Sequence, residues 1–299
     1  MSQGGTQPTT GEYPAQRKAP RAPREEGRPN GSEIKVPGVR VIPGPTADTA
    51  KIEWRGQLKI VAQWETDAAL EMTRGDSQKA LLIYDVILTA FPRYAKAWYN
   101  KAYVLHTQIR DYPRALEAYD RARKALPGNL DIIHNMAKLL ADMRKHDEAL
   151  AAYAQVLQQD PNYLKSLEGS GALLINTGRP QDAIPRLERA VEIYKQKAQD
   201  PYRAQQLLAT AYSNLGREKD ALRLLDAAIG RHPEDDSLWE ARGIALSNEG
   251  RYRDAVMSLT KALRINKRNK FAWDTREQLL DVCKQNKIKF SEGELSLGE

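Results

Sequence analysis

Apolar and small side chains recur about every 34 residues between Trp64 and Trp273. In five of six periods a bulky apolar residue is followed four places later by Ala or Gly, and in the fifth period Gln205 takes its place; a further Ala lies about twelve places on. The apolar positions of a period form two stripes with helical spacing, which Gly or a polar turn separates. This pattern predicts two antiparallel helices per period, stacked so that neighbouring units bury a continuous core.

Six full units and a half unit follow from the period. We expect the full units at 61–94, 95–129, 130–163, 164–201, 202–235 and 236–269, and a capping helix at 270–286. Ala102, Gly171 and Gly243 are the expected contact points, because closely crossing helices leave no room for a branched side chain. The second unit carries one extra residue between Gln108 and Tyr112, and the fourth unit is about four residues longer than the others.

These positions resemble the tetratricopeptide repeat family, whose pattern is W-x2-L-G-x2-Y, then A-x3-F, A and P. The second unit carries the resemblance through Trp98, Ala102, Ala115, Tyr119, Ala122 and Pro127. The resemblance covers about residues 61–286 and implies an all-α, right-handed α-solenoid of stacked helix-turn-helix units with a C-terminal capping helix. In that family the first helices line a concave groove that holds a segment of a partner protein.

The two ends of the chain differ from the repeats in composition. Residues 1–45 contain eight Pro and seven Gly with few apolar clusters, which predicts a disordered basic tail. Within it, Pro20-Arg21-Ala22-Pro23 has the spacing of a polyproline ligand or of a plain linker. Trp54, Leu58, Val61 and Trp64 would share one helical face, so 46–60 is expected to be a helical extension. Residues 287–299 are expected to form a flexible tail.

Composition and charge indicate an intracellular, cytoplasmic protein. A single cysteine, Cys283, excludes an internal disulfide, and no apolar stretch approaches the roughly 20 residues needed to cross a bilayer. The first residues also lack the apolar core of a signal peptide. The formal net charge of +7 arises mainly from the two ends of the chain.

The sequence offers little catalytic chemistry. The four histidines, His106, His134, His146 and His232, lack metal-ligand spacing. Gly169-Ser170-Gly171 lacks the Lys-Ser/Thr ending of a phosphate-binding loop and falls inside a predicted helix, where packing explains it better. We therefore expect no catalytic residue, no metal, no cofactor and no enzymatic activity.

The groove implied by the resemblance supplies the candidate binding residues. They are Lys96, Tyr99, Asn100, Tyr103, His106, His134, Asn135, Lys138, Lys165, Asn176, Asn214 and Asn248. Tyr99 and Tyr103 stand one helical turn apart and are the preferred hot spot, unless one or both pack against the neighbouring first helix.

Asparagines repeat at two positions of the units and allow two interpretations. Asn100 and Asn135 lie in mid-helix, where an amide can donate to and accept from a bound peptide backbone. Asn176, Asn214 and Asn248 stand two residues before a Gly, so local hydrogen bonding at a helix end competes with peptide binding.

A specific family function can be tested on the same positions. Members that bind chaperones hold a C-terminal carboxylate with Lys, Asn, Asn, Lys and Arg at five groove positions. On the second to fourth units these positions hold Tyr99, Tyr103, Asn135, Lys165 and Gly169, and only two match. Such a terminus would be poorly held.

The sequence therefore favours a scaffold that binds a partner protein or peptide in the groove. One alternative is a nucleic-acid-associated factor that uses the basic tail and the cluster Arg264, Lys267, Arg268 and Lys270. Another is an assembly subunit of a larger complex, which its partner rather than the chain itself would attach to a membrane. The oligomeric state is left open.

Overall fold

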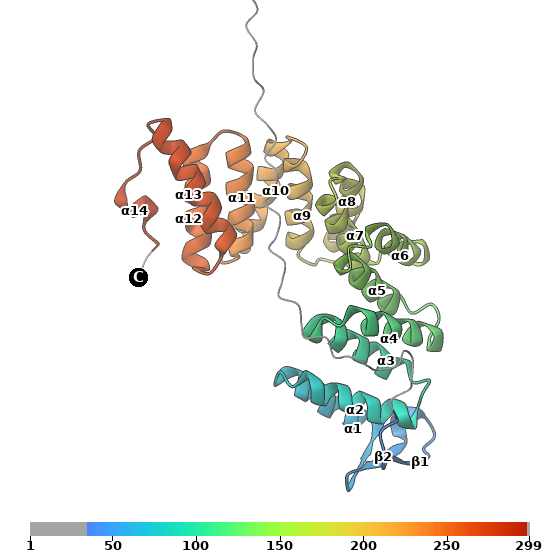
Figure 1. The fold of residues 1–299 in the computed structure, drawn as a ribbon. Helices are drawn as coiled ribbons and strands as arrows, with labels where there is room; N and C mark the ends of the chain where they lie inside the picture. Colours follow the sequence, from blue (N-terminus) through green and yellow to red (C-terminus); the bar gives the residue numbers. More distant parts are fainter. Residues whose placement is uncertain (1–34, 298–299) are drawn as a thin grey trace, which may run out of the picture. The chain divides into compact units, whose positions relative to one another are not determined.

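Six helix pairs follow one another along the chain in the computed structural model, which describes residues 35–297 (Figure 1). The pairs are α1 Val61–Thr73 with α2 Ser77–Ala90, α3 Ala95–Val104 with α4 Tyr112–Ala125, α5 Leu130–Asp142 with α6 His146–Gln159, α7 Leu164–Asn176 with α8 Pro180–Gln196, α9 Tyr202–Ser213 with α10 Glu218–Ile229, and α11 Asp236–Asn248 with α12 Tyr252–Ile265. Helices α13 Lys270–Gln285 and α14 Glu292–Leu295 follow them. The predicted all-α solenoid is confirmed, and each expected unit contains one helix pair.

Small residues set the close approach within a pair. A Cβ atom added at Gly171 would lie 2.7 Å from Leu187 Cδ2, and one at Gly243 would lie 2.7 Å from Leu259 Cγ. Ala102, at the same position of the second unit, is fully buried. These residues are the contact points expected from the sequence, because a larger side chain would push the paired helices apart.

Tryptophans fix the connection between consecutive units. The Nε1–H groups of Trp98, Trp239 and Trp273 donate to the carbonyl oxygens of Pro92, Pro233 and Lys267, each six residues earlier, at 2.8, 2.8 and 3.0 Å. Each indole therefore locks the loop that leads into its own first helix. Because the same bond recurs in two units and in the capping helix, these tryptophans belong to the frame of the repeat.

The extra residue of the second unit is absorbed as a π-helical turn, Leu105–Ile109, at the end of α3. The Asp111 N–H donates to Leu105 O across six residues, whereas Lys145 N–H in the third unit donates to Leu140 O across five. Wider turns of this kind accommodate one inserted residue without ending the helix. The extra length of the fourth unit lies in α8, which has 17 residues against 14 in α6.

A three-stranded antiparallel sheet stands where the sequence predicted a helical extension over 46–60. The strands are β1 Arg40–Ile42, β2 Lys51–Trp54 and β3 Gln57–Ile60, in the order β1-β2-β3, and a short 3-10 helix, Ala47–Thr49, precedes β2. The register pairs Arg40 with Glu53 and Lys51 with Ile60.

The turn between β2 and β3 explains why the helical prediction was wrong. Arg55 and Gly56 have φ angles of 51° and 75°, which suit a two-residue hairpin and break a helix. Ile52 and Trp54 alternate inward along β2, and Leu58 is 51% exposed instead of buried. Trp54 and Trp64 do meet, with ring centroids 5.9 Å apart, but through a sheet packed on α1.

The described part of the expected N-terminal tail is also packed. Val36 is buried, and its N–H donates to Thr89 Oγ1 of α2 at 3.0 Å. Residues 35–45 therefore belong to the folded unit, which corrects the predicted boundary at 45. Residues 1–34, with the Pro20–Pro23 motif, lie outside the described part of the chain.

The C-terminal segment 287–297 folds back on the last unit, so the flexible tail predicted there is wrong for these residues. The Arg264 side chain donates to the carbonyl oxygens of Gly293 and Ser296, both at 2.8 Å. Arg276, which is buried, donates to Leu295 O at 2.9 Å. We call Ser291–Leu297 the C-terminal strap; it contacts α12 and, through Arg276, α13.

Candidate partner-binding site

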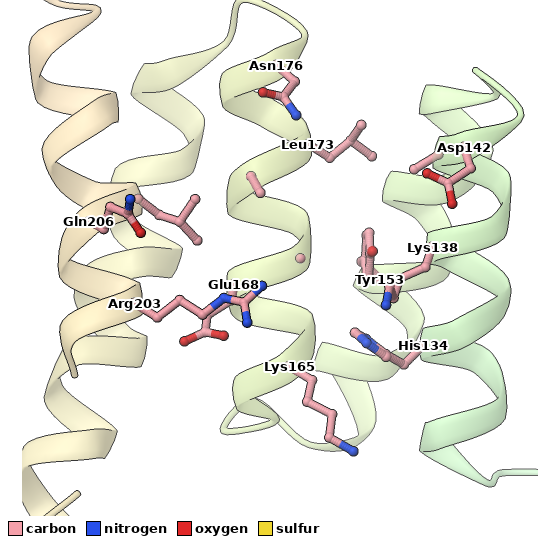
Figure 2. A pocket seen from close by; sticks show the side chains of 14 residues that line it. His134, Lys138, Asp142, Tyr153, Lys165, Glu168, Leu173, Asn176, Arg203 and Gln206 are labelled. Atoms are coloured by element: carbon pink, nitrogen blue, oxygen red, sulfur yellow. The ribbon is translucent and has the colours of Figure 1, made fainter. Parts of the chain in front are cut away.

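A cavity of about 540 Å³ opens between the first helices of the third, fourth and fifth units, α5, α7 and α9 (Figure 2). We call it the central cavity. It is lined by His134, Lys138, Ala141, Asp142, Tyr153, Lys165, Glu168, Gly169, Ala172, Leu173, Asn176, Arg203, Gln206 and Leu207. Tyr153 comes from α6 and its ring lies against Gly169 of α7.

Two small residues on α7 make this hollow. Gly169 stands at the position that Asn135 and Leu207 occupy in the adjacent units, and Ala172 stands at the position of Lys138. A Cβ atom at Gly169 would lie 2.9 Å from the Tyr153 hydroxyl oxygen, so the tyrosine fills the space a side chain would need. The surface of α7 is consequently recessed between its two neighbours.

The rim of the central cavity carries both signs of charge. Lys138 and Arg203 approach from α5 and α9, while Lys165 Nζ lies 2.9 Å from Asp131 Oδ1. Hydrogen bonds from Tyr163 and Lys165 hold the pKa of the Asp131 carboxyl below its usual range. The charge of Lys165 is therefore partly balanced by a carboxylate of the preceding unit.

Glu168 is one of the two carboxylates that line the central cavity. Burial raises the pKa of Glu168, while a hydrogen bond from Tyr194 and the charge of Arg203 act in the opposite direction. Its Oε1 atom is buried and has no hydrogen-bond partner among the residues that the structure describes. Figure 2 shows the Glu168 and Arg203 side chains next to each other on the α9 side of the cavity.

His134 forms part of the wall instead of projecting into solvent. Its Nδ1 lies 3.0 Å from Ser166 Oγ, and its ring packs 5.6 Å from Tyr153 and 5.8 Å from Tyr163. Burial, followed by repulsion from Lys138 and Lys165, lowers the pKa of His134 to about 4. The ring is thus neutral at pH 7 and suited to packing.

The predicted aromatic patch on α3 is divided by the structure. Tyr103 is exposed, but Tyr99 is half-buried and its hydroxyl accepts from Asn135 Nδ2 at 3.0 Å. His106 is buried in the π-helical turn, with Nε2 2.7 Å from Asp142 Oδ2 of the next unit. The expectation of two exposed tyrosines is therefore wrong for Tyr99, which packs against the neighbouring first helix.

The remaining predicted residues fall into two groups. Lys96 pairs with Glu65 of the preceding unit at 2.7 Å, Asn100 is half-buried, and Asn135 is buried and also donates to Asp131 O. Asn176, Asn214 and Asn248 are exposed at helix ends, and Asn248 Nδ2 donates to Ser213 Oγ of the preceding unit at 3.1 Å.

Four of the twelve predicted residues line the central cavity, namely His134, Lys138, Lys165 and Asn176. The floor residues Tyr153 and Leu173, and the small residues that create the hollow, were absent from the predicted set. The sequence did contain a signal for the small residues: Gly169 and Ala172 occupy two groove positions at which α5 carries Asn135 and Lys138.

Other chemistry is limited within residues 35–297. That range contains no group of three or more His, Cys, Asp or Glu side chains placed to hold a metal ion. Its helices include none that combines the length and the apolar character needed to cross a membrane. Arg264, a member of the basic cluster considered for nucleic-acid binding, donates hydrogen bonds to the strap and is therefore already engaged within the chain.

Comparison with known proteins identifies the class of the fold. Tetratricopeptide repeat models match residues 68–129, 110–170, 140–201, 174–243 and 237–269. The chain belongs to the tetratricopeptide repeat family. A curated relative, small glutamine-rich tetratricopeptide repeat-containing protein 2 of Mycosarcoma maydis, is 31% identical over 98 residues. The match covers 33% of this chain and only 27% of that protein.

Solved structures share the fold at low sequence identity. The APC/C hetero-tetramer Cut9–Hcn1 gives a TM-score of 0.63 at 16% identity, over 74% of this chain and 43% of that chain. A Parabacteroides merdae repeat protein gives 0.58 at 18%, over 79% and 98% of the two chains. A repeat protein from Thermus thermophilus gives 0.52 at 17%, over 62% and 98%. These matches concern the fold alone.

Proposed function

We propose that this protein is a non-enzymatic interaction scaffold whose central cavity holds one side chain of a partner's extended segment. The repeat fold supports a role in protein interaction in general. The observation that carries the finer proposal is the recess at Gly169 and Ala172, which interrupts an otherwise filled row of groove residues.

The shape and lining of the central cavity suit an apolar side chain with polar surroundings. Its volume of about 540 Å³ falls within the range typical of ligand sites. Leu173, Leu207 and the Tyr153 ring give an apolar floor, on which an aromatic or branched side chain can bury its surface. Asn176 at the rim is exposed and can both donate to and accept from a peptide backbone.

Charge at the rim favours a neutral side chain in the cavity. Lys138, Lys165 and Arg203 face Asp142 and Glu168 around the same opening. A charged side chain that entered would meet one like charge for nearly every opposite charge, while losing its hydration. Because His134 is already engaged by Ser166, we assign the ionisable groups here to positioning instead of catalysis.

A substitution at Ala172 can fill the central cavity without changing the residues at which the paired helices cross. Ala172→Met should weaken binding of a groove peptide at least tenfold, because the longer side chain occupies the hollow, a loss of about 1.4 kcal/mol or more. Peptides would be selected from a phage-displayed random library on the folded protein and their affinities measured by titration. Ala69→Met, at the same position of the first unit and exposed, is the matched control.

The two variants separate the possible outcomes. Selected peptides that bind Ala172→Met and the unaltered chain equally well would exclude the central cavity as the site. Equal weakening by Ala172→Met and Ala69→Met would indicate a general effect on the groove, and would also contradict the proposal.

A further inference from the structure

A second cavity, of about 680 Å³, lies between α4 and the connection from α2 to α3, apart from the central cavity. We call it the Trp98 cavity. It is lined by Pro92, Arg93, Trp98, Arg121, Lys124 and Ala125. None of these residues belongs to the predicted groove set, and the proposed function does not use them.

Charge distinguishes this cavity from the central one. Three of its lining residues, Arg93, Arg121 and Lys124, are cationic, and no lining residue carries a carboxylate. Arg93 is exposed and forms an ion pair with none of the described carboxylates. The cavity therefore favours an anionic ligand, whereas the central cavity is close to balanced.

The two cations on α4 have carboxylate partners one helical turn away. Arg121 pairs with Glu117 at 3.0 Å, and Lys124 pairs with Asp120 at 2.6 Å. Exposed pairs of this kind are weak, because water and salt screen them and the long side chains lose entropy. An incoming carboxylate can consequently share or replace these partners.

Trp98 holds one of the cations in a defined orientation. Its Nε1–H is fixed on Pro92 O at 2.8 Å, and the Arg121 guanidinium lies 4.8 Å from the centroid of the indole ring. When a guanidinium stacks on an aromatic ring, the N–H groups at the edge of the guanidinium can still donate to a planar, bidentate acceptor such as a carboxylate. Lys101, buried against Asp85, supports the ring from 5.1 Å.

The chain itself shows how a second helix of a repeat holds an acidic segment. Arg264 of α12 stands at the position of Lys124 when Ala255 is aligned with Ala115. It donates to two carbonyl oxygens of the C-terminal strap, and Arg253 pairs with Glu294 of the same segment. A cation at this position of the repeat therefore reaches a peptide that lies on the helix pair.

We propose that the Trp98 cavity binds an acidic, extended segment of a partner protein, whose carboxylates meet Arg93, Arg121 and Lys124. A nucleic acid fits less well, because Trp98 is the one aromatic ring that lines this cavity and it already contacts Arg121 and Lys101, which leaves little open ring surface for a stacked base. The site is independent of the central cavity, so the two proposals stand or fall separately.

The test uses the full chain and two fluorescein-labelled probes, octaglutamate and octaglutamine. Octaglutamate should bind, and Arg93→Gln and Lys124→Gln should each weaken it at least fivefold, since each removes one charge-assisted contact. Arg114→Gln is the matched control, because it removes the same charge from α4 at an exposed residue that does not line the cavity and whose ion-pair partner is Asp111, not Asp120. It should change the affinity less than twofold.

Each alternative result overturns the proposal. Equal weakening by all three variants would mean unspecific attraction to a basic surface. Tighter binding of an eight-nucleotide single strand than of octaglutamate, weakened by the same variants, would assign the cavity to nucleic acid. Equal binding of octaglutamine would exclude recognition of carboxylates, and circular dichroism melting would verify that each variant is folded.

Discussion

Several polar residues on the first helices bond to the neighbouring unit. Asn135 donates to Tyr99 Oη, His106 contacts Asp142, and Lys96 pairs with Glu65. These contacts join units one to three in the same way that the apolar core does, and they satisfy groups that would otherwise be buried alone. A polar residue at a groove position is therefore not automatically available to a partner.

His134 also bonds to the neighbouring unit, through Ser166, and its contribution to stability can be measured. Its pKa of about 4 in the fold lies below the ordinary value of 6.5, so the unfolded chain binds more protons between these two pH values. The stability contributed by the neutral ring is complete above about pH 6.5 and is lost as the pH falls toward 4. The loss should amount to at most about 3 kcal/mol.

Chemical denaturation at pH 7.5 and pH 4.5, on the unaltered chain and on His134→Gln, checks this value. Other titrating groups contribute to both proteins and cancel in the difference. His134→Gln should lose less stability on acidification than the unaltered chain does. Identical pH dependence in the two proteins would show that His134 is accessible to protons in the folded state.

Among the elements, the sheet β1-β2-β3 departs most from expectation. The four residues Trp54, Leu58, Val61 and Trp64 have a spacing that fits one helical face, yet the chain forms a hairpin at Arg55-Gly56. Periodicity over so few residues does not distinguish a helix from a buried strand. The hairpin became the stable choice because it lets Ile52 and Trp54 pack on α1.

A pair of substitutions distinguishes the sheet from the helix. Ile52→Ala should destabilise the first unit by about 2–4 kcal/mol, because Ile52 is fully buried. Leu58→Ala should cost less than about 0.5 kcal/mol, since that side chain is largely exposed. Amide exchange of α1 and α2 would report both effects. A larger effect of Leu58→Ala would contradict the sheet and support the helical extension predicted over 46–60.

At the level of the whole molecule, each unit touches mainly its neighbours, so stability should be distributed locally along the chain. Deleting residues 290–299 removes the C-terminal strap from Arg264 and Arg276 and uncovers one side of α12 and α13. Amide exchange should then accelerate in α12 and α13 while α5 to α7 keep their protection. Unchanged exchange in α12 and α13, or an equal increase along the whole chain, would contradict this local effect.

The sequence by itself determined the helix pairs and the small residues at which they cross. Those features depend on contacts between residues close in the chain or one repeat apart, and such contacts recur visibly as a period of about 34 residues. The lengthened α8 and the extra residue before α4 were predictable for the same reason. Family membership follows from this periodic frame.

Tertiary structure alone decided which groove residues are available and where the chain is hollow. Tyr99, His106 and Asn135 are occupied by side chains more than thirty residues away or by aromatic rings on α4, which no local pattern reveals. The central cavity exists because Gly169 and Ala172 lie between the larger residues of two other helices. The sheet and the strap likewise cover apolar side chains of the first and last described units, through contacts that the repeat period does not reveal.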